Sequence, residues 1–172
     1  MADYRGVLGA FPYAFRATDS RLCQSYVLFG GLLSVVVALG FLVSLAGVLA
    51  NPGGGGSLVV LLALLVVAPL VAPVLFVARR HRTTGSSKTY DFLLALAGYV
   101  FVGTLYAGIL ASMPECFETG GETVCRSPPA GVLAPVVRAL YGVPEHLSFL
   151  LPLAGAALVY LTHRVASRRL SA

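Results

Sequence analysis

The residues that could support chemistry in this sequence are its three cysteines and three histidines. Cys116 and Cys125 enclose eight residues, and the Thr119, Gly120 and Gly121 stretch between them is typical of a turn. The enclosed segment has few apolar residues that could fix its shape, and the turn would let it double back. We therefore expect Cys116 and Cys125 to form a disulfide that closes a loop.

The histidines and acidic residues do not form the pattern of a catalytic or metal site. His81, His146 and His163 are scattered, and the chain has neither a Cys-x-x-Cys nor a His-Glu-x-x-His spacing. Glu145 and His146 are adjacent, but neighbouring side chains on a helix point about 100° apart, so we interpret the pair as a solvated helix start. Asp91 follows a basic segment, and we interpret it as a cap-like acid near the positive end of a helix dipole. The sequence thus predicts no enzyme: no catalytic, cofactor-binding or metal-binding residue, and no cofactor.

The composition indicates an integral membrane protein. Hydrophobic residues make up 58% of the 172 residues and charged residues 11%, whereas ordinary soluble domains have about 45–50% and about 25%. Residues 22–78 contain no acidic residue, no basic residue and no histidine. Uncharged apolar runs of about 20 residues are typical of helices that cross a bilayer.

We predict an all-α fold in which four transmembrane helices form an up-down bundle behind a short N-terminal interfacial segment. Residues 1–21 are expected to be a cytoplasmic amphipathic segment, and residues 22–172 a single four-helix transmembrane domain. The four spans are predicted at about 23–49, 58–78, 90–113 and 144–162. The connections between them are a glycine-rich breaker at 51–57, a basic linker at 79–88 and an outer loop at 114–143.

Small residues at helical spacing indicate where the spans approach other helices. Gly40 and Ser44 are four residues apart and share one face of the first span. Thr104, Gly108 and Ser112 form a similar stripe on the third span. Because small side chains let helix backbones come close, we predict that both stripes are helix-packing surfaces.

Two prolines predict a bend in the second span. Pro69 and Pro73 are four residues apart, and each removes one backbone hydrogen bond and pushes on the preceding turn of the helix. We expect a kink between about residues 66 and 72.

The basic residues predict the orientation of the chain. Of the 12 Lys and Arg residues, Arg126 and Arg138 lie in the loop at 114–143, and the other ten lie in the N-terminal segment, the linker and the C-terminal tail. Because cytoplasmic segments carry the excess of Lys and Arg, we predict a multi-pass protein of the plasma (cell) membrane with both termini cytoplasmic. The linker residues expected to contact anionic lipid headgroups are Arg79, Arg80, Arg82 and Lys88.

The distribution of polar residues favours a non-catalytic role. Ionisable residues inside a membrane mark coupled transporters, and the middles of all four predicted spans lack them. We expect a scaffold or an accessory subunit of a larger membrane complex, whose partners are the lipid bilayer and either another membrane protein or a second copy, with no nucleic acid. The alternative is a small homo-oligomeric channel or transporter, lined by Ser34, Ser44, Thr104, Tyr106 or Ser112.

A remote alternative is a membrane thiol–disulfide redox enzyme. Four short spans with outward cysteines resemble the quinone-linked disulfide oxidases, which relay electrons between two cysteine pairs, one of them usually Cys-x-x-Cys. Here only Cys116 and Cys125 are predicted outside, eight residues separate them, and Cys23 is predicted near the opposite face. The chain departs from that pattern in both the number and the spacing of its cysteines.

Overall fold

The computed structural model describes residues 6–50, 56–119, 122–126 and 130–169. The elements along these residues are α1 (Gly6–Ala17), α2 (Arg21–Ala50), α3 (Gly56–Thr83), α4 (Lys88–Ala111), strands β1 (Cys116–Thr119) and β2 (Glu122–Cys125), α5 (Ala134–Tyr141), a 3₁₀ turn η1 (Glu145–Leu147) and α6 (Leu150–Arg169). Four helical segments are long and apolar enough to cross a membrane, and they correspond to α2, most of α3, α4, and η1 with α6. The four predicted spans are confirmed as helices of that length and composition.

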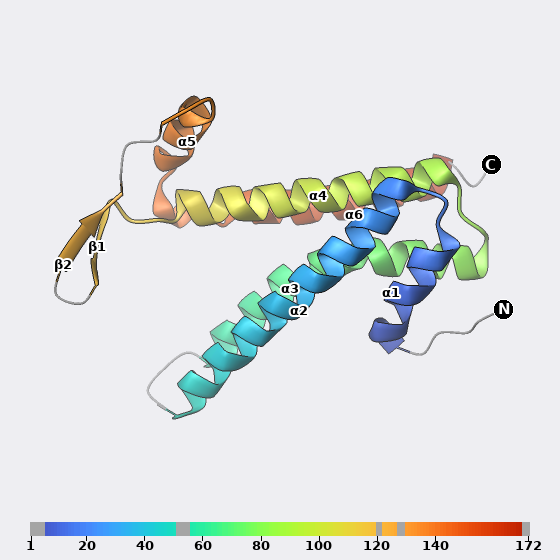
Figure 1. Cartoon of the computed structure of the whole chain (residues 1–172), viewed down its shortest axis with the longest axis horizontal. Helices are drawn as coiled ribbons and strands as arrows, with labels where there is room; N and C mark the ends of the chain where they lie inside the picture. Colours follow the sequence, from blue (N-terminus) through green and yellow to red (C-terminus); the bar gives the residue numbers. More distant parts are fainter. Residues whose placement is uncertain (1–5, 51–55, 120–121, 127–129, 170–172) are drawn as a thin grey trace.

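The four long helices form two antiparallel hairpins, α2 with α3 and α4 with α6 (Figure 1). The hairpins meet where α3 ends and α4 begins, on the side of both termini, and they separate toward the other end of the molecule. We call the meeting point the basic end, because Arg79, Arg80, Arg82, Lys88 and Arg164 lie there. The helices of each hairpin run in opposite directions, but the two hairpins diverge, so the predicted up-down four-helix bundle is not confirmed.

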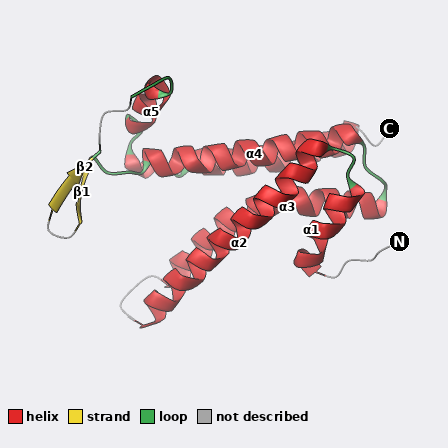
Figure 2. Ribbon diagram, in the orientation of Figure 1, coloured by secondary structure: helices red, strands yellow, loops and turns green. Residues whose placement is uncertain are grey.

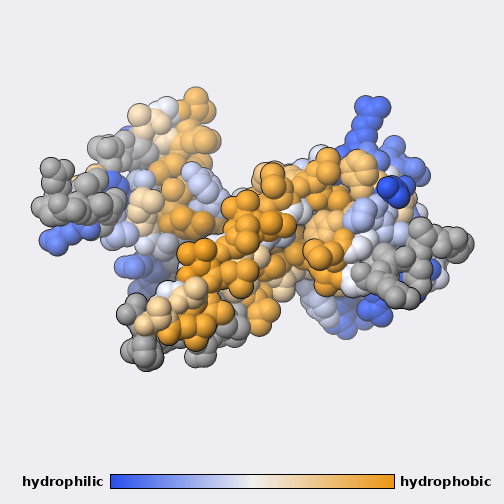
Figure 3. Space-filling model, turned by 60° about the horizontal axis from the view of Figure 1, so that its bottom comes forward, coloured by the Kyte–Doolittle hydropathy of each residue, from blue (hydrophilic) through white to orange (hydrophobic). Residues whose placement is uncertain are grey.

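Packing explains this divergence, because the buried side chains gather toward the basic end. One cluster joins Ala10 and Ala14 of α1 to Tyr26 of α2, Val77 of α3 and Leu94 of α4. A second cluster further along joins α3, α4 and α6 through Leu70, Phe101 and Val159. In contrast, α2 from Val35 to Ala50 is exposed or half-buried throughout. Figure 3 shows the result as hydrophobic side chains over the middle of the molecule, between more hydrophilic ends.

The third helix follows both hairpins in turn. Its N-terminal part runs beside α2 and its C-terminal part turns to lie beside α4 (Figure 2). Pro69 and Pro73 lie within this continuous helix. The breaker predicted at 51–57 falls largely outside the described residues, but Gly56 and Ser57 belong to α3.

The structure adds detail to three of the predicted segments. The basic linker is mostly helical, since α3 continues to Thr83 and places its arginines in the last turn, where cations complement the helix dipole. The fourth long helix starts at Leu150 and runs on to Arg169, so His163 belongs to a helix and not to a tail. The N-terminal segment forms α1, in which Ala10 and Ala14 are fully buried against the other helices.

The loop predicted at 114–143 contains structure of its own. Strands β1 and β2 pair antiparallel with Cys116 opposite Cys125 and Glu118 opposite Thr123. Helix α5 follows and has no buried residue. This two-stranded hairpin is the feature that the all-α prediction missed within the described residues. We call this part of the molecule the hairpin end.

Candidate functional site

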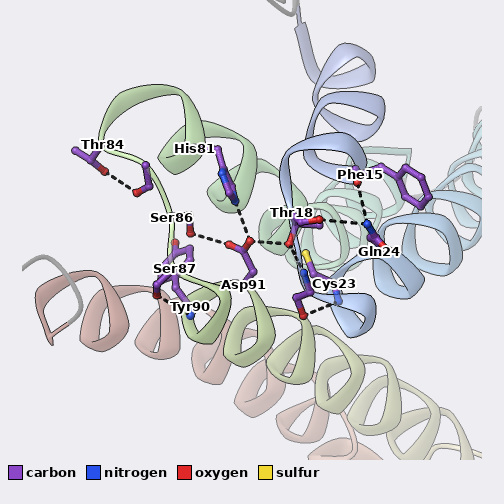
Figure 4. A network of polar contacts seen from close by, with 12 residues as sticks. Phe15, Thr18, Cys23, Gln24, His81, Thr84, Ser86, Ser87, Tyr90 and Asp91 are labelled. Atoms are coloured by element: carbon purple, nitrogen blue, oxygen red, sulfur yellow. Dashed lines mark hydrogen bonds and ion pairs between the residues drawn. The ribbon is translucent and has the colours of Figure 1, made fainter. Parts of the chain in front are cut away.

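The most highly connected polar group lies at the basic end and centres on Asp91, whose side chain is 1% exposed. Its Oδ2 accepts hydrogen bonds from Thr18 Oγ1 at 2.6 Å and from His81 Nε2 at 2.8 Å. Its Oδ1 accepts one from Ser86 Oγ at 2.7 Å. We call Thr18, His81, Ser86 and Asp91 the polar core (Figure 4). It ties together the α1–α2 connection, the last turn of α3, the α3–α4 connection and the first turns of α4.

Helix caps place these residues. Ser20 precedes α2, and its Oγ accepts from the backbone N–H of Cys23 at 3.4 Å. Ser87 precedes α4, and its Oγ accepts from the N–H of Tyr90 at 3.2 Å. In both cases a serine satisfies an N–H group that the helix leaves without a partner. Ser87 therefore performs the capping that the sequence assigned to Asp91, which leaves the Asp91 carboxylate to join separate elements.

The polar core consists of hydrogen bonds that connect separate elements of the fold. An ionised carboxylate only accepts hydrogen bonds, so His81 Nε2 carries a proton toward Asp91. Three donors occupy the two oxygens of Asp91, so its carboxylate connects segments that are far apart in the sequence. No group of three metal-ligating side chains occurs among the described residues.

An aromatic group adjoins the polar core. The hydroxyl of Tyr90 and Nδ1 of His163 are 2.6 Å apart. The ring of His163 stacks on Phe76 with 3.9 Å between the ring centroids. The guanidinium of Arg80 lies 4.3 Å from the centroid of the Tyr90 ring. These contacts join α3, α4 and α6, whereas the polar core joins the α1–α2 connection to α3 and α4.

The side chain of Tyr26 connects α2 to α3 near its two prolines through a hydrogen bond. Its hydroxyl donates to the backbone carbonyl of Leu70 at 2.8 Å, three residues before Pro73, where a proline loosens the helix. A Cβ on Gly98 would collide with the Tyr26 ring, and a Cβ on Gly30 would lie 3.2 Å from it. The side chain of Tyr26 is 1% exposed, so these glycines supply the room that it needs.

The stripe predicted on the third span faces α6. A Cβ on Gly108 would lie 2.9 Å from Cδ of Pro152, and a Cβ on Gly155 would collide with Oγ1 of Thr104. Ser112 lies just after α4, is half-buried, and donates to the carbonyl of Ile109 at 2.9 Å. Thr104 and Gly108 thus lie where small residues let α4 and α6 come close.

The stripe predicted on the first span does not pack within the described chain. Gly40 and Ser44 are exposed, and nothing lies within 4 Å of a Cβ built on Gly40. The Ser44 hydroxyl donates to the carbonyl of Gly40 at 3.0 Å. The hairpins have already separated at this level of α2, so the packing role predicted for Gly40 and Ser44 stays a prediction that concerns a helix outside the described chain.

The residues considered as a pore lining come from α2 and from α4 with the residue that follows it, and the serine and threonine hydroxyls among them donate to backbone carbonyls of their own helix. Ser34 Oγ donates to the Gly30 carbonyl at 2.6 Å, and Thr104 Oγ1 donates to the Phe101 carbonyl at 2.8 Å. Ser34 is buried, whereas Tyr106 is 63% exposed. Their placement does not favour a shared polar lumen.

The four basic residues predicted to contact headgroups have different surroundings. Arg79 is exposed and Arg80 half-buried, and both line a cavity between α3 and α6. Arg82 and Lys88 are exposed and do not line it. Glu145 and His146 are exposed in η1 at the hairpin end, in keeping with a solvated helix start.

The structure joins Cys116 and Cys125 in the predicted disulfide, across the register of β1 and β2. Cys23 is a free, buried thiol beside the polar core. Helix α4 has 24 residues and separates the two sites by roughly 36 Å at 1.5 Å per residue. A relay of thiol exchange between Cys23 and the disulfide is therefore not favoured.

We expect mass spectrometry of a non-reduced digest to recover a peptide that links Cys116 to Cys125. Exchanging both cysteines for serine should loosen the hairpin, since closing a ring of this size stabilises by roughly 2–3 kcal/mol. The far-ultraviolet circular dichroism of the helices should be unchanged, because helices satisfy their own backbone hydrogen bonds. Free thiols at both positions in protein from its native membrane would contradict the pairing.

Sequence reasoning missed the polar core and the Tyr26 contact. Thr18 and Asp91 are 73 residues apart, so no local spacing indicates that they meet. His81 and Asp91 are ten residues apart on either side of the α3–α4 connection. The signal that could have found them is an acid placed just after a segment that is otherwise basic and contains a histidine.

The comparisons with known proteins give one match. The model of a family described as a domain of unknown function (DUF8056) matches residues 1–167. No curated protein and no solved structure matches the chain.

Proposed function

We propose that this chain, which belongs to the DUF8056 family, is a non-catalytic polytopic membrane protein that serves as a scaffold or accessory subunit of a larger membrane complex. The observation that carries the proposal is the state of α2. The most apolar stretch of this helix has a mean hydropathy of 2.7 and is 6% buried, whereas the corresponding stretches of α3 and α4 are 39% and 33% buried. The most apolar helix of the chain is thus the one that the chain itself covers least.

The small-residue face of α2 supports contact with another helix. Lipid chains are as apolar as leucine, so helices associate in a membrane mainly where small residues allow close packing. Gly40 and Ser44 provide such a face on the part of α2 that leads away from the other hairpin. The partner in this proposal is a helix of a different membrane protein, and a second copy of this chain is the alternative that the assembly experiment separates.

The charge distribution supports an orientation with both termini on the cytoplasmic side of the plasma membrane. The basic end holds the last turns of α3 and α6, with Arg80 and Arg82 in one and Arg168 and Arg169 in the other. The hairpin end holds Arg126, which is close to Glu115 at 3.6 Å. An excess of Lys and Arg is typical of cytoplasmic segments.

Labelling of single added cysteines tests this orientation. Thr84 at the basic end and Val132 at the hairpin end are both exposed, and Val132 is 96% exposed. In intact cells, a membrane-impermeant thiol reagent should label Val132→Cys and spare Thr84→Cys, and permeabilisation should make both react. The parent chain, labelled under the same conditions, gives the background signal from Cys23, and this signal is subtracted from that of each variant. Labelling of Thr84→Cys alone would reverse the orientation.

Native electrophoresis of membranes solubilised in mild detergent tests the assembly. Gly40→Leu should remove the chain from its larger complex, because a large side chain forces the helix backbones apart. Its own fold should not suffer, because no described residue lies within 4 Å of a Cβ at this position. Co-purifying proteins identified by mass spectrometry separate a foreign partner from a second copy.

Ala46→Leu is the matched control for the assembly experiment. Ala46 is also exposed, and it lies two positions after Ser44, about 200° further round the helix. This control should keep the complex intact. A parent chain that migrates alone from its native membrane, or a complex that Gly40→Leu leaves unchanged, would rule out the proposed role of this face.

A further inference from the structure

At the basic end, α3 and α6 line an open cavity of about 210 Å³. This is far above the 10–15 Å³ or so that one water molecule needs. The lining side chains come from the end of α3, the connection that follows it and the last turns of α6: Arg79, Arg80, Thr83, Thr84, His163 and Ser167, with Phe76 beside them. We infer that this cavity is a binding site for a phosphoryl group.

The charge of the lining selects an anion. Among the described residues, the guanidinium groups of Arg79 and Arg80 line the cavity and no carboxylate does. Asp91, an acid at the same end of the molecule, already accepts from Thr18, His81 and Ser86. Arginine presents a planar fork of N–H donors that matches phosphate oxygens. A phosphoryl group offers those oxygens together with negative charge.

Contacts outside the cavity hold its donors in place. The Arg80 guanidinium lies over the Tyr90 ring at 4.3 Å, which restricts its movement. The Tyr90 hydroxyl engages Nδ1 of His163 at 2.6 Å, and Phe76 stacks on the same imidazole. With Nδ1 engaged, Nε2 is the ring nitrogen of His163 left for a ligand. Groups fixed before binding lose less conformational freedom when the ligand arrives.

The hydroxyl groups of the lining play a smaller part. Thr83 Oγ1 donates to the Arg79 carbonyl at 3.1 Å, and Thr84 Oγ1 donates to the Gly85 carbonyl at 3.3 Å. Their protons are thus directed at backbone oxygens. The binding energy for a phosphoryl group must come mainly from the guanidinium groups and the imidazole, so removing one of these should weaken binding most.

This site differs from a general basic surface and does not depend on the assembly proposed above. A diffuse surface would use all four basic residues of the predicted linker alike, whereas Arg82 and Lys88 do not line the cavity. The same phosphoryl chemistry can come from the headgroup of an anionic phospholipid or from a soluble phosphate. The two sources are separated by the probes below.

The test uses the purified full chain with two probes. Inorganic phosphate is titrated into protein in neutral detergent by equilibrium dialysis, and phosphatidic acid is titrated in phosphatidylcholine nanodiscs, with bound lipid counted by native mass spectrometry. We expect Arg79→Gln to weaken binding by at least about tenfold, because it removes a charge-assisted hydrogen bond. Arg79 is exposed, so this variant keeps the fold.

Arg82→Gln is the matched control, because it removes the same charge in the same helical turn but outside the cavity. It should leave the affinity close to that of the parent. Binding of both probes with this pattern supports a phosphoryl site open to soluble ligands, and binding of phosphatidic acid alone with this pattern assigns the site to a lipid headgroup. Equal weakening of binding by Arg79→Gln and Arg82→Gln would mean that the probes bind a general basic surface and not this cavity, which would contradict the inference. Failure of both probes to bind would overturn the inference.

Discussion

Replacing Asp91 with alanine should lower the free energy of unfolding by about 3 kcal/mol or more, since each buried donor left without its acceptor costs about 1–3 kcal/mol. The reason is that three buried or half-buried donors lose their acceptor at once: Thr18, His81 and Ser86. A buried donor left without a partner costs its full desolvation penalty. Unfolding by SDS titration in mixed micelles measures the change.

Asp91→Asn is the control that separates size from hydrogen bonding. Asparagine has nearly the same shape as aspartate and keeps one oxygen acceptor, so it should lose distinctly less stability than alanine. His81→Gln should fall between them, because it removes one of the three donors and leaves Thr18 and Ser86 in place. If Asp91→Ala proves no more destabilising than a change at exposed Arg82, the polar core does not tie the elements together.

Replacing Gly98 with leucine is the second change with a large expected effect, and it should cost about 3 kcal/mol or more. A Cβ at this position already collides with the ring of Tyr26, and overpacking of a filled core typically costs about 1–3 kcal/mol and occasionally more. The ring cannot retreat without losing its hydrogen bond to the Leu70 carbonyl. The same SDS titration gives the magnitude.

Gly103→Leu on the same helix is the matched control, because nothing lies within 4 Å of a Cβ there. It should leave stability nearly unchanged. A double-mutant cycle sharpens the test: Gly98→Ala should be destabilising in the parent and close to neutral when Tyr26 is alanine, since the two residues are in contact. Equal effects in both backgrounds would mean that Gly98 acts through something other than Tyr26.

The sequence predicted what depends on local pattern. The apolar runs locate the four long helices because a span must be apolar along its whole length. The disulfide follows from two nearby cysteines around turn-forming residues. In each case the residues that carry the signal are neighbours along the chain, so their types are enough to predict the structure.

The rest depends on contacts between distant segments. Gly40 and Gly98 look equally suitable for helix packing, but Gly98 meets a tyrosine 72 positions earlier in the chain and Gly40 meets nothing within 4 Å. The divergence of the hairpins has the same origin, because it reflects where the buried clusters form and not the composition of any one helix. The spacing of small residues indicates a face but does not say what lies against it.

The polar core also sets an order of events during biosynthesis. Thr18 leaves the ribosome 73 residues before Asp91, and chains are made from the N-terminus onward. The hydroxyl of Thr18 and the imidazole of His81 therefore cannot bond to the Asp91 carboxylate until the start of α4 has been translated. We expect the α1–α2 connection to become protected from protease only in nascent chains that extend past Asp91. Asp91 in the first turns of α4 thus completes the hydrogen bonds of Thr18 and His81, which belong to the α1–α3 part of the chain. The folding of the α2–α3 hairpin therefore depends on the α4–α6 hairpin.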